Sequence, residues 1–302
     1  MSRLVYHLFL LPVSRLPLPV LYVFSNLLYW ILYRMLGYRR KIVYRNLRHS
    51  FPQRSEAEIR SLMHQFYRHF FDMIVETVRN LSAPYAEIAR RFVVTNPEVL
   101  NHYRAQGRQV MLLTGHYNNW EILVVGLARQ VPYHVVGIYK ALRNPFMEEK
   151  MRERRGRYGM ELVHTKISTG WMEAHANDPI AYFFMGDQSP TFSKHVYWTR
   201  FLNQETAVFT GAEWLCKKYN MALFYGHIEK VKRGHYTYTL ELLNDQPRET
   251  PPNYLTGLHT RKLEEEIKKE PAYWLWTHKR WKRRRKPEEP LHEYHPSSSL
   301  RE

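Results

Sequence analysis

The sequence of 302 residues contains one cysteine, Cys216, so no disulfide can form within the chain. The same count excludes a zinc cluster built from cysteines. The 16 histidines show no ordered metal-ligand spacing, and we expect neither a metal nor another cofactor. A sequence that has so few thiols and no repeat of fixed period is typical of a globular protein that faces the cytosol.

Acidic residues are also few: 28 Asp and Glu stand against 45 Lys and Arg, which gives a formal net charge of +17. Such a surface attracts anions, whether nucleic acid, anionic lipid or an acidic protein. The basic run KRWKRRRK (Lys279–Lys286) is compatible with each of them. Because no helix-turn-helix, zinc finger or aromatic-basic RNA motif accompanies this run, we expect no nucleic-acid partner.

Long apolar runs are nearly absent, and only Leu16–Tyr33 extends over 18 residues without a charge. This length barely spans a bilayer, and two prolines and two polar residues interrupt it. The stretch lacks the small-residue cleavage site of a secretory signal peptide. A buried apolar helix is the alternative, but the basic cluster Arg39–Lys41 beside it favours anchoring at the cytoplasmic side of a membrane. We expect residues 1–36 to form an N-terminal anchor helix.

The section Arg39–Asn80 is predicted to be helical. Ser55 and Glu58 have the spacing of a capping box after the break at Pro52, and apolar residues then recur at helical intervals. These apolar residues are expected to form core, with no chemistry implied.

From about Phe92 onward, short β-type runs alternate with helical patterns, which is typical of an α/β domain with a mainly parallel sheet flanked by helices. The expected strands are Val110–Leu113, His134–Tyr139, Ile180–Met185, Ala222–Ile228 and Tyr236–Leu240. The expected helices are Ile122–Gln130, Pro145–Tyr158, Ser168–Asn177, Gly211–Tyr219 and Tyr254–Lys269. We expect one domain over residues 37–286 and a disordered tail over residues 287–302, which lacks a core-forming pattern.

A ligand site in such a fold lies beyond the carboxyl ends of the strands, where His116, Lys140 and Asp187 fall. In the stretch GHYNNWE, His116 ends a strand and Glu121 follows five residues later, in the first turns of the next helix. Because His116 precedes the helix, Glu121 can fold back onto it and orient it as a general base. No serine or cysteine nucleophile accompanies this pair, which favours direct attack by a substrate hydroxyl. A packed histidine beside a solvated glutamate is the alternative interpretation.

Seven motifs stand in order along the chain at compatible spacing. They are NLRHSFP (Asn46–Pro52), GHYNNWE (Gly115–Glu121), YKALRNP (Tyr139–Pro145), RERRGRYG (Arg152–Gly159), GDQSP (Gly186–Pro190), FLNQETAVFTGAEWLCKKYNMAL (Phe201–Leu223) and PAYWLWTHKRWKRR (Pro271–Arg284). Through these motifs the chain resembles the bacterial lipid A biosynthesis acyltransferases, the late lauroyl and myristoyl transferases of the lysophospholipid acyltransferase-like superfamily. The resemblance extends from about Gly37 to Arg285.

This resemblance implies a fold like that of the lysophospholipid and glycerol-3-phosphate acyltransferases, and a membrane-associated enzyme. The donor would be an acyl thioester on acyl carrier protein or another carrier, and the acceptor a hydroxyl of a lipid A precursor. GHYNNWE resembles the family's His-x4-Asp/Glu motif, which makes His116 the general base, oriented by Glu121. The chain has Lys140 where the family often has Arg, and Ser189 where it commonly has Asp.

Five further residues are candidates for substrate binding. Arg155 is aligned with the family's basic helix and would stabilise an oxyanion, but three neighbouring arginines compete with it. Asn144 either joins the site or caps the following helix. Asp187 and Gln188 either hold a basic residue or the acceptor sugar, or satisfy their own turn. Lys140 would meet a substrate phosphate.

Two other functions remain open at this stage. The acceptor could be another glycolipid or an aminolipid, since relatives in this superfamily acylate several lipids. A non-catalytic basic protein that binds membranes or nucleic acid is the third hypothesis, and an intact His116–Glu121 pair argues against it.

Overall fold

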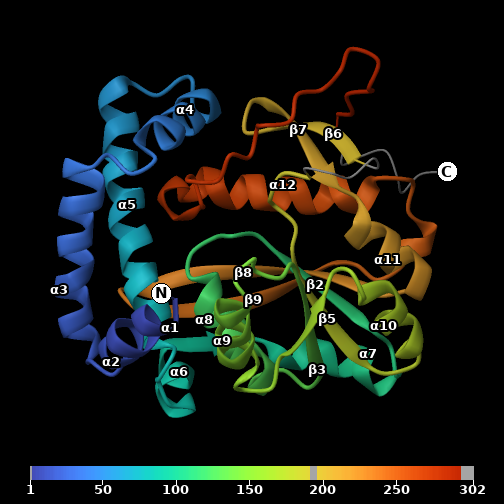
Figure 1. Ribbon diagram of the computed structural model, residues 1–302. Helices are drawn as coiled ribbons and strands as arrows, with labels where there is room; N and C mark the ends of the chain where they lie inside the picture. The colour runs from blue at the N-terminus through green and yellow to red at the C-terminus, as the bar shows by residue number, and fades with distance from the viewer. Residues whose placement is uncertain (1, 191–195, 294–302) are drawn as a thin grey trace.

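A computed structural model of the chain describes residues 2–190 and 196–293 (Figure 1). Its centre is a seven-stranded sheet with the strand order β1-β9-β8-β2-β5-β3-β4. All neighbouring strands run parallel except β8 and β9, so the expected mainly parallel α/β sheet is confirmed. The strands are β1 (Phe92–Val94), β2 (Val110–Thr114), β3 (His134–Tyr139), β4 (Glu161–His164), β5 (Ile180–Met185), β8 (Ala222–Lys232) and β9 (His235–Asn244).

Helices cover the sheet, and a separate hairpin of β6 (Val196–Phe201) and β7 (Gln204–Phe209) lies beyond α12 (Figure 1). An N-terminal layer of helices stands at the side where β8 ends and β9 begins (Figure 1). The helices after the first 36 residues are α4 (Arg40–Ser50), α5 (Glu56–Arg79), α6 (Tyr85–Arg91), α7 (Asn101–Ala105), α8 (Trp120–Gly126), α9 (Pro145–Gly156), α10 (Ser168–Ala174), α11 (Gly211–Tyr219) and α12 (Tyr254–Lys269).

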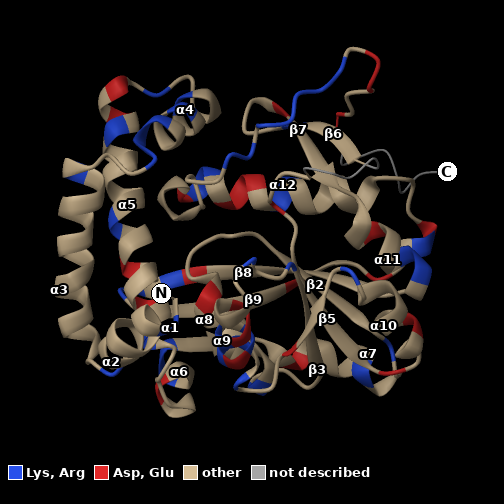
Figure 2. Cartoon of the chain, viewed as in Figure 1, with Lys and Arg blue, Asp and Glu red and all other residues tan. Residues whose placement is uncertain are grey.

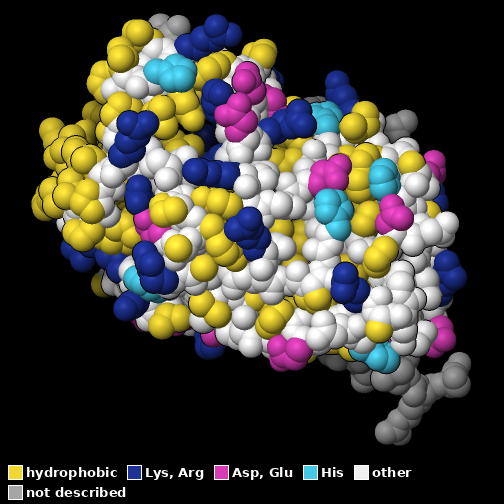
Figure 3. All heavy atoms as spheres, turned by 90° about the horizontal axis from the view of Figure 1, so that it is seen from below, with side chains coloured by type: hydrophobic (Ala, Val, Ile, Leu, Met, Phe, Trp, Pro, Cys, Tyr) yellow, Lys and Arg dark blue, Asp and Glu magenta, His cyan; other side chains and the backbone are white. Residues whose placement is uncertain are grey.

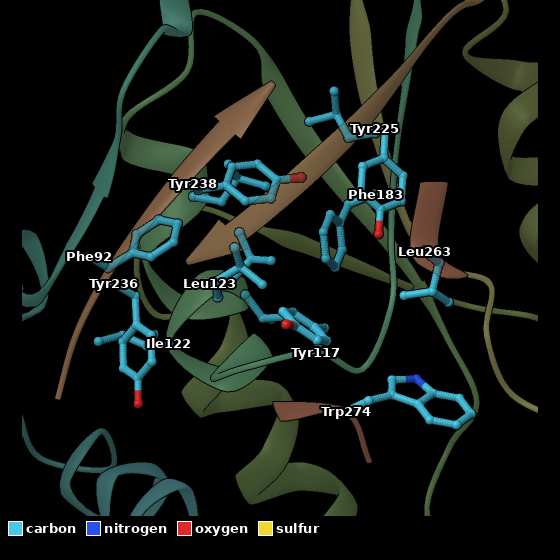
Figure 4. Packing of buried hydrophobic residues seen from close by; sticks show 14 of the residues in the cluster. Phe92, Tyr117, Ile122, Leu123, Phe183, Tyr225, Tyr236, Tyr238, Leu263 and Trp274 are labelled. Atoms are coloured by element: carbon cyan, nitrogen blue, oxygen red, sulfur yellow. The ribbon is translucent and has the colours of Figure 1, made fainter. Parts of the chain in front are cut away.

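The period of two along strand β2 explains how both faces of the sheet are covered. Val110 and Leu112 belong to the large core cluster, together with Ile122 of α8. Met111 points to the other face and packs in a second cluster with Cys216 of α11. Because both faces are buried, the strand consists of apolar residues without polar alternation. Figure 4 shows the larger cluster, in which Phe92, Ile122, Leu123 and Phe183 lie close to the tyrosines of β8 and β9.

Several predicted elements have the observed bounds, among them β3, β5, α11 and α12. Strand β8 continues to Lys232, four residues past the predicted end, because it forms an antiparallel ribbon with β9 whose far end is solvated. The capping box is confirmed: Ser55 Oγ accepts from the N–H of Glu58, and Glu58 Oε2 accepts from the N–H of Ser55. Of the tail expected to be disordered, residues 294–302 lie outside the described residues, while the N–H of His292 donates to the carbonyl of Trp198 on β6 at 2.8 Å.

Residues 2–35 form two helical pieces. The first runs through α1 (Ser2–Val5), η1 (Tyr6–Leu10) and α2 (Leu11–Ser14), and the second through α3 (Leu18–Leu28) and the π-helical turns of η2 (Tyr29–Met35). Pro17, which has an extended backbone, separates them, because a proline has no backbone N–H to continue the first helix.

Helix α3 lies along α5 and is tied to it by polar contacts. The hydroxyl of Tyr22 donates to Glu76 Oε1 at 2.9 Å, and that of Ser25 donates to Asp72 Oδ1 at 2.7 Å. Residues three apart share one helix face, so the opposite face of α3 is left apolar and uncharged (Figure 2). The exposed apolar side chains of α3 and η2 are Val20, Val23, Phe24, Leu27, Trp30, Ile31 and Met35.

A single apolar anchor helix is not confirmed. Among residues 2–190 and 196–293, no one helix is long and apolar enough to cross a bilayer. The stretch Leu18–Met35 reaches that length and composition only together with Arg40–Ser50, and the two are bent by 85°.

Gly226 allows the close approach of β8 and β9. A Cβ atom built there would lie 1.8 Å from the hydroxyl of Tyr238, whose ring is buried. We predict that Gly226→Ala lowers the free energy of unfolding by about 1–3 kcal/mol, because the ring must move within a packed core. Urea unfolding of the purified protein measures this loss.

Gly170 in α10 provides the matched control, since nothing lies within 4 Å of its added Cβ. Gly170→Ala is expected to raise stability by about 0.5–1 kcal/mol, because alanine favours the helix. Equal midpoints for the two variants would contradict the packing described here.

Candidate active site

The turn between β2 and α8 carries His116 and is fixed from both sides. Asn119 caps α8: its Oδ1 accepts from the N–H of Ile122 at 3.0 Å, and its Nδ2 donates to Glu76 Oε2 at 2.7 Å. Asn118 adopts a left-handed backbone with φ of 48°, a conformation that asparagine tolerates better than most residues. The local sequence therefore produces a short, rigid turn rather than a continuous helix from His116 to Glu121.

His116 and Asp187 meet because of the register between two parallel strands. Thr114 at the end of β2 pairs with Met185 at the end of β5, and each functional residue comes two positions later. His116 Nδ1 donates to Asp187 Oδ1 at 2.6 Å. On the other side of the ring, the amide Nε2 of Gln188 lies 3.1 Å from His116 Nε2. The structure thus brings three predicted site residues together.

Asp187 is buried, and its second oxygen is also occupied. Trp274 Nε1 donates to Asp187 Oδ2 at 2.8 Å, and the N–H of Leu275 donates to the carbonyl of His116 at 3.1 Å. Burial alone would raise the pKa of Asp187, but the His116 ring and the two side-chain hydrogen bonds together lower it well below its usual range. The ionised carboxylate keeps the proton of His116 on Nδ1 and leaves Nε2 as a base.

Glu121 does not contact His116 in the structure. Its carboxylate instead binds the guanidinium groups of Arg154 and Arg155, with Arg155 Nη2 at 2.7 Å from Oε1. Burial acts to raise the pKa of Glu121, but the two arginines outweigh it and lower the pKa to about 2. The prediction that Glu121 orients His116 is corrected: helix α8 carries Glu121 toward α9, and Asp187 takes the place at the imidazole.

The remaining predicted residues lie around α9. Asn144 caps this helix, because its Oδ1 accepts from the N–H of Met147 at 3.0 Å, and its Nδ2 donates to Ser2 Oγ at 2.9 Å. Lys140 is exposed just after β3. Arg155 is partly exposed beside Glu121, whereas Arg154 is buried. No observation on these side chains places a substrate, so their binding roles stay predictions.

Two more histidines and an arginine surround Asp187. His278 Nε2 accepts from the N–H of Ser189 at 3.1 Å, and burial lowers the pKa of both His278 and His259 to about 4. Burial also lowers the pKa of Arg280, to about 10, so its guanidinium is still charged at neutral pH. Within the described residues, no group of three or more His, Cys, Asp or Glu side chains could hold a metal ion.

The sequence patterns did not predict Trp274, Arg154 or Glu76 as parts of this site. Trp274 lies in the motif PAYWLWTHKRWKRR, which pointed to the segment but not to the residue. Arg154 stood among four arginines that spacing alone did not separate. Glu76 is a carboxylate at an apolar helical position of α5, and that position was the available signal.

The arrangement has the elements of a general base for a hydroxyl group. His116 Nδ1 is hydrogen-bonded to the buried carboxylate of Asp187. Its Nε2 lies beside the amide of Gln188, and the histidine side chain is partly exposed. In the described part of the chain, no serine or cysteine is hydrogen-bonded to this histidine. The fold is an α/β fold whose candidate site lies at the carboxyl ends of parallel strands, and a histidine held in this way is able to accept a proton from an oxygen nucleophile.

The chain belongs to the bacterial lipid A biosynthesis acyltransferase family, which matches residues 3–283. It is an acyltransferase. It is similar to the lipid A biosynthesis lauroyltransferase of Escherichia coli strain K12, at 26% identity over 277 residues, which cover 90% of this chain and 88% of the relative. The palmitoleoyltransferase of lipid A biosynthesis from the same strain is 24% identical over 274 residues, 89% of this chain and 87% of the relative.

Glu121 should make stability depend on pH. Its pKa is lowered to about 2 from 4.5, so its ionised form contributes about 3 kcal/mol above pH 4.5. That contribution is lost as the pH falls from about 4.5 to about 2. We predict that Glu121→Gln is less stable than the wild type at neutral pH and that this gap narrows over the same pH range.

Urea unfolding at a series of pH values measures the gap. Glu98→Gln serves as the control, since Glu98 is exposed and has no cationic partner among residues 2–190 and 196–293. A gap for Glu121→Gln that stays constant down to about pH 2 would show that the two arginines do not stabilise the folded carboxylate.

Proposed function

We propose that the protein transfers a fatty acyl chain from acyl carrier protein to a hydroxyl of a lipid A precursor. The family and the names of the two Escherichia coli relatives support this acceptor, and the cationic surface supports an acidic carrier protein as donor. The observation that carries the chemistry is the hydrogen bond from His116 Nδ1 to Asp187, which leaves Nε2 to accept a proton.

In the proposed reaction, His116 Nε2 takes the proton of the acceptor hydroxyl while its oxygen attacks the thioester carbonyl carbon. Asp187 stabilises the imidazolium that forms. The tetrahedral intermediate then collapses, the carbon–sulfur bond breaks, and the imidazolium returns its proton to the leaving thiolate. Gln188 lies 3.1 Å from Nε2, so its amide marks the place where the hydroxyl would lie.

The oxyanion of the intermediate needs a donor, and Arg155 is proposed for it. Glu121 fixes the position of Arg155 through a hydrogen bond of 2.7 Å while leaving part of the guanidinium exposed. In this proposal Glu121 supports the reaction through the arginine rather than through His116. Lys140 and Asn144 are proposed to face the acceptor at the same edge, where a cation and an amide suit a phosphate or a sugar.

The exposed apolar face of α3 and η2 is proposed to bind the cytoplasmic face of the inner membrane. Figure 3 shows hydrophobic side chains gathered at the end of the molecule where the N-terminal helices lie, with basic side chains close by. Exposed apolar patches of this kind mark interaction sites, and a helix with one apolar face can lie in the plane of a membrane surface. Because the proposed acceptor is a water-insoluble lipid, the enzyme must reach it at the membrane surface.

We predict that His116→Ala reduces acyl transfer by about 10²–10⁴-fold, the usual contribution of a general base, with no change in fold. Asp187→Asn should also reduce the rate, because asparagine accepts the same hydrogen bond but cannot stabilise the imidazolium. Transfer from acyl carrier protein to a lipid A precursor is measured with purified variants, with melting curves beside the rates.

His134→Ala is the matched control, since His134 also pairs with a carboxylate, Glu161, but at an exposed site. Its rate should stay near that of the wild type. A folded His116→Ala variant with normal turnover would overturn the mechanism, and a lipid A profile unaltered by gene deletion would point to another glycolipid or an aminolipid as acceptor.

Membrane binding should depend on the apolar face of α3. We predict that Val23→Gln with Leu27→Gln weakens binding to neutral phospholipid vesicles by about tenfold or more, because each side chain loses its transfer free energy. The control is Ile167→Gln with Trp214→Gln, whose side chains are similarly exposed but lie at α10 and α11, far from α3 (Figure 1). Equal losses in a vesicle sedimentation assay would argue against α3 as the membrane-facing surface.

A further inference from the structure

A basic pocket of about 670 Å³ lies between η2, the start of α4 and the start of α5. Its volume is within the range of sites for small ligands. Four cations line it, Arg34, Arg40, Lys41 and Arg60, against one carboxylate, Glu56. The pocket therefore carries a large excess of positive charge in a small space, apart from the site around His116.

Glu56, the one carboxylate among the described residues that line the pocket, already has partners. Glu56 Oε1 accepts from Arg60 Nε at 2.9 Å, and Glu56 Oε2 accepts from the hydroxyl of Tyr44 at 2.9 Å. In the described part of the chain, neither Arg34, Arg40 nor Lys41 forms an ion pair with a carboxylate. The donors of these three side chains are thus free for an anion from outside the chain.

Aromatic rings hold the two arginines in place. The guanidinium of Arg34 lies 5.4 Å from the centre of the Trp30 ring, and that of Arg40 lies 5.4 Å from the Tyr33 ring. A guanidinium over an aromatic face keeps its in-plane N–H donors available, which suits bidentate binding of a phosphate. Burial, then Arg34, Arg68 and Arg40, lower the pKa of His64 at the pocket wall, so this ring adds no charge of its own.

The pocket adjoins the apolar face described above. Trp30 and Met35 of η2 are 58% and 77% exposed, and Leu36, which follows η2, is 70% exposed. If these side chains lie among lipid tails, the cations of the same segment lie at the depth of the headgroups, as in other interfacial helices. A headgroup phosphate is the anion found at that depth.

We propose that this pocket binds the phosphate group of an anionic phospholipid at the membrane surface. The inference rests on the membrane association proposed above and adds to it a defined headgroup site. Arg34, Arg40 and Lys41 bind the phosphate oxygens, while Trp30, Met35 and Leu36 contact the tails. Binding of this kind sets the orientation of the protein on the membrane as well as its affinity.

The test is sedimentation of the full chain with vesicles of phosphatidylcholine alone and with added phosphatidylglycerol. The combined variant Arg34→Gln, Arg40→Gln, Lys41→Gln should lose about 10²-fold of its affinity for the anionic vesicles, since each basic residue at the surface contributes about fivefold. Its binding to the neutral vesicles should stay unchanged. Failure of wild-type binding to both vesicles would count against membrane association itself.

The matched control is Arg104→Gln, Lys166→Gln, Arg200→Gln, which removes the same charge from exposed positions elsewhere. This variant should keep most of the affinity that phosphatidylglycerol adds, because charges more than about 8 Å from the membrane surface are screened. Equal losses of affinity in the two variants would overturn the proposed pocket, since the net charge of the protein would then explain the binding. If soluble glycerol 3-phosphate displaced the protein from the anionic vesicles as strongly as added phosphatidylglycerol does, the assignment of the pocket to a lipid would be overturned. Acyl transfer in detergent micelles should stay normal in both variants.

Discussion

The buried carboxylate of Glu76 is the interaction on which the rest of the structure depends. A carboxylate without water must find donors, and Glu76 has three, each from a different part of the chain, with a guanidinium close by. Tyr22 of α3, Asn119 of the His116 turn and Tyr236 of β9 donate hydrogen bonds of 2.7–3.0 Å, and Arg91 of α6 lies at 3.5 Å. Burial raises the pKa of this group, and Arg91 acts against the rise. The N-terminal layer, the sheet and the active-site turn are therefore held by one group.

The turn that Glu76 supports places two carboxylates, Asp187 and Glu121, against different partners. Asp187 accepts from the histidine ring, and Glu121 binds two guanidinium groups, although Glu121 is far nearer to His116 in sequence. In the proposed mechanism the carboxylate at the imidazole stabilises a charge that appears during the reaction, whereas the carboxylate between two arginines balances charges that are always present. The two requirements differ, and the chain meets them with separate residues.

Much of this could be predicted from the sequence, and the exceptions have physical reasons. The strands His134–Tyr139 and Ile180–Met185 are continuous apolar runs with buried faces, so their bounds were predictable. The strands that were missed are short or belong to the separate β6–β7 hairpin. His116 and Asp187 were each chosen, but their contact depends on β2 and β5 being neighbours in the sheet, which spacing along the chain does not contain. The preference for Glu121 came from sequence proximity, which the Asn119 cap overrides.

The hydrogen bonds between α3 and α5 restrict how α3 can move relative to the rest of the protein. Tyr22 and Ser25 donate to Glu76 and Asp72, so α3 cannot move away from α5 without breaking a hydrogen bond to each of these buried carboxylates. The apolar face of α3 and the turn that carries His116 are therefore joined through Glu76, which accepts a hydrogen bond from each of the two elements. We expect the distance between that face and His116 to stay the same whatever surface the face meets.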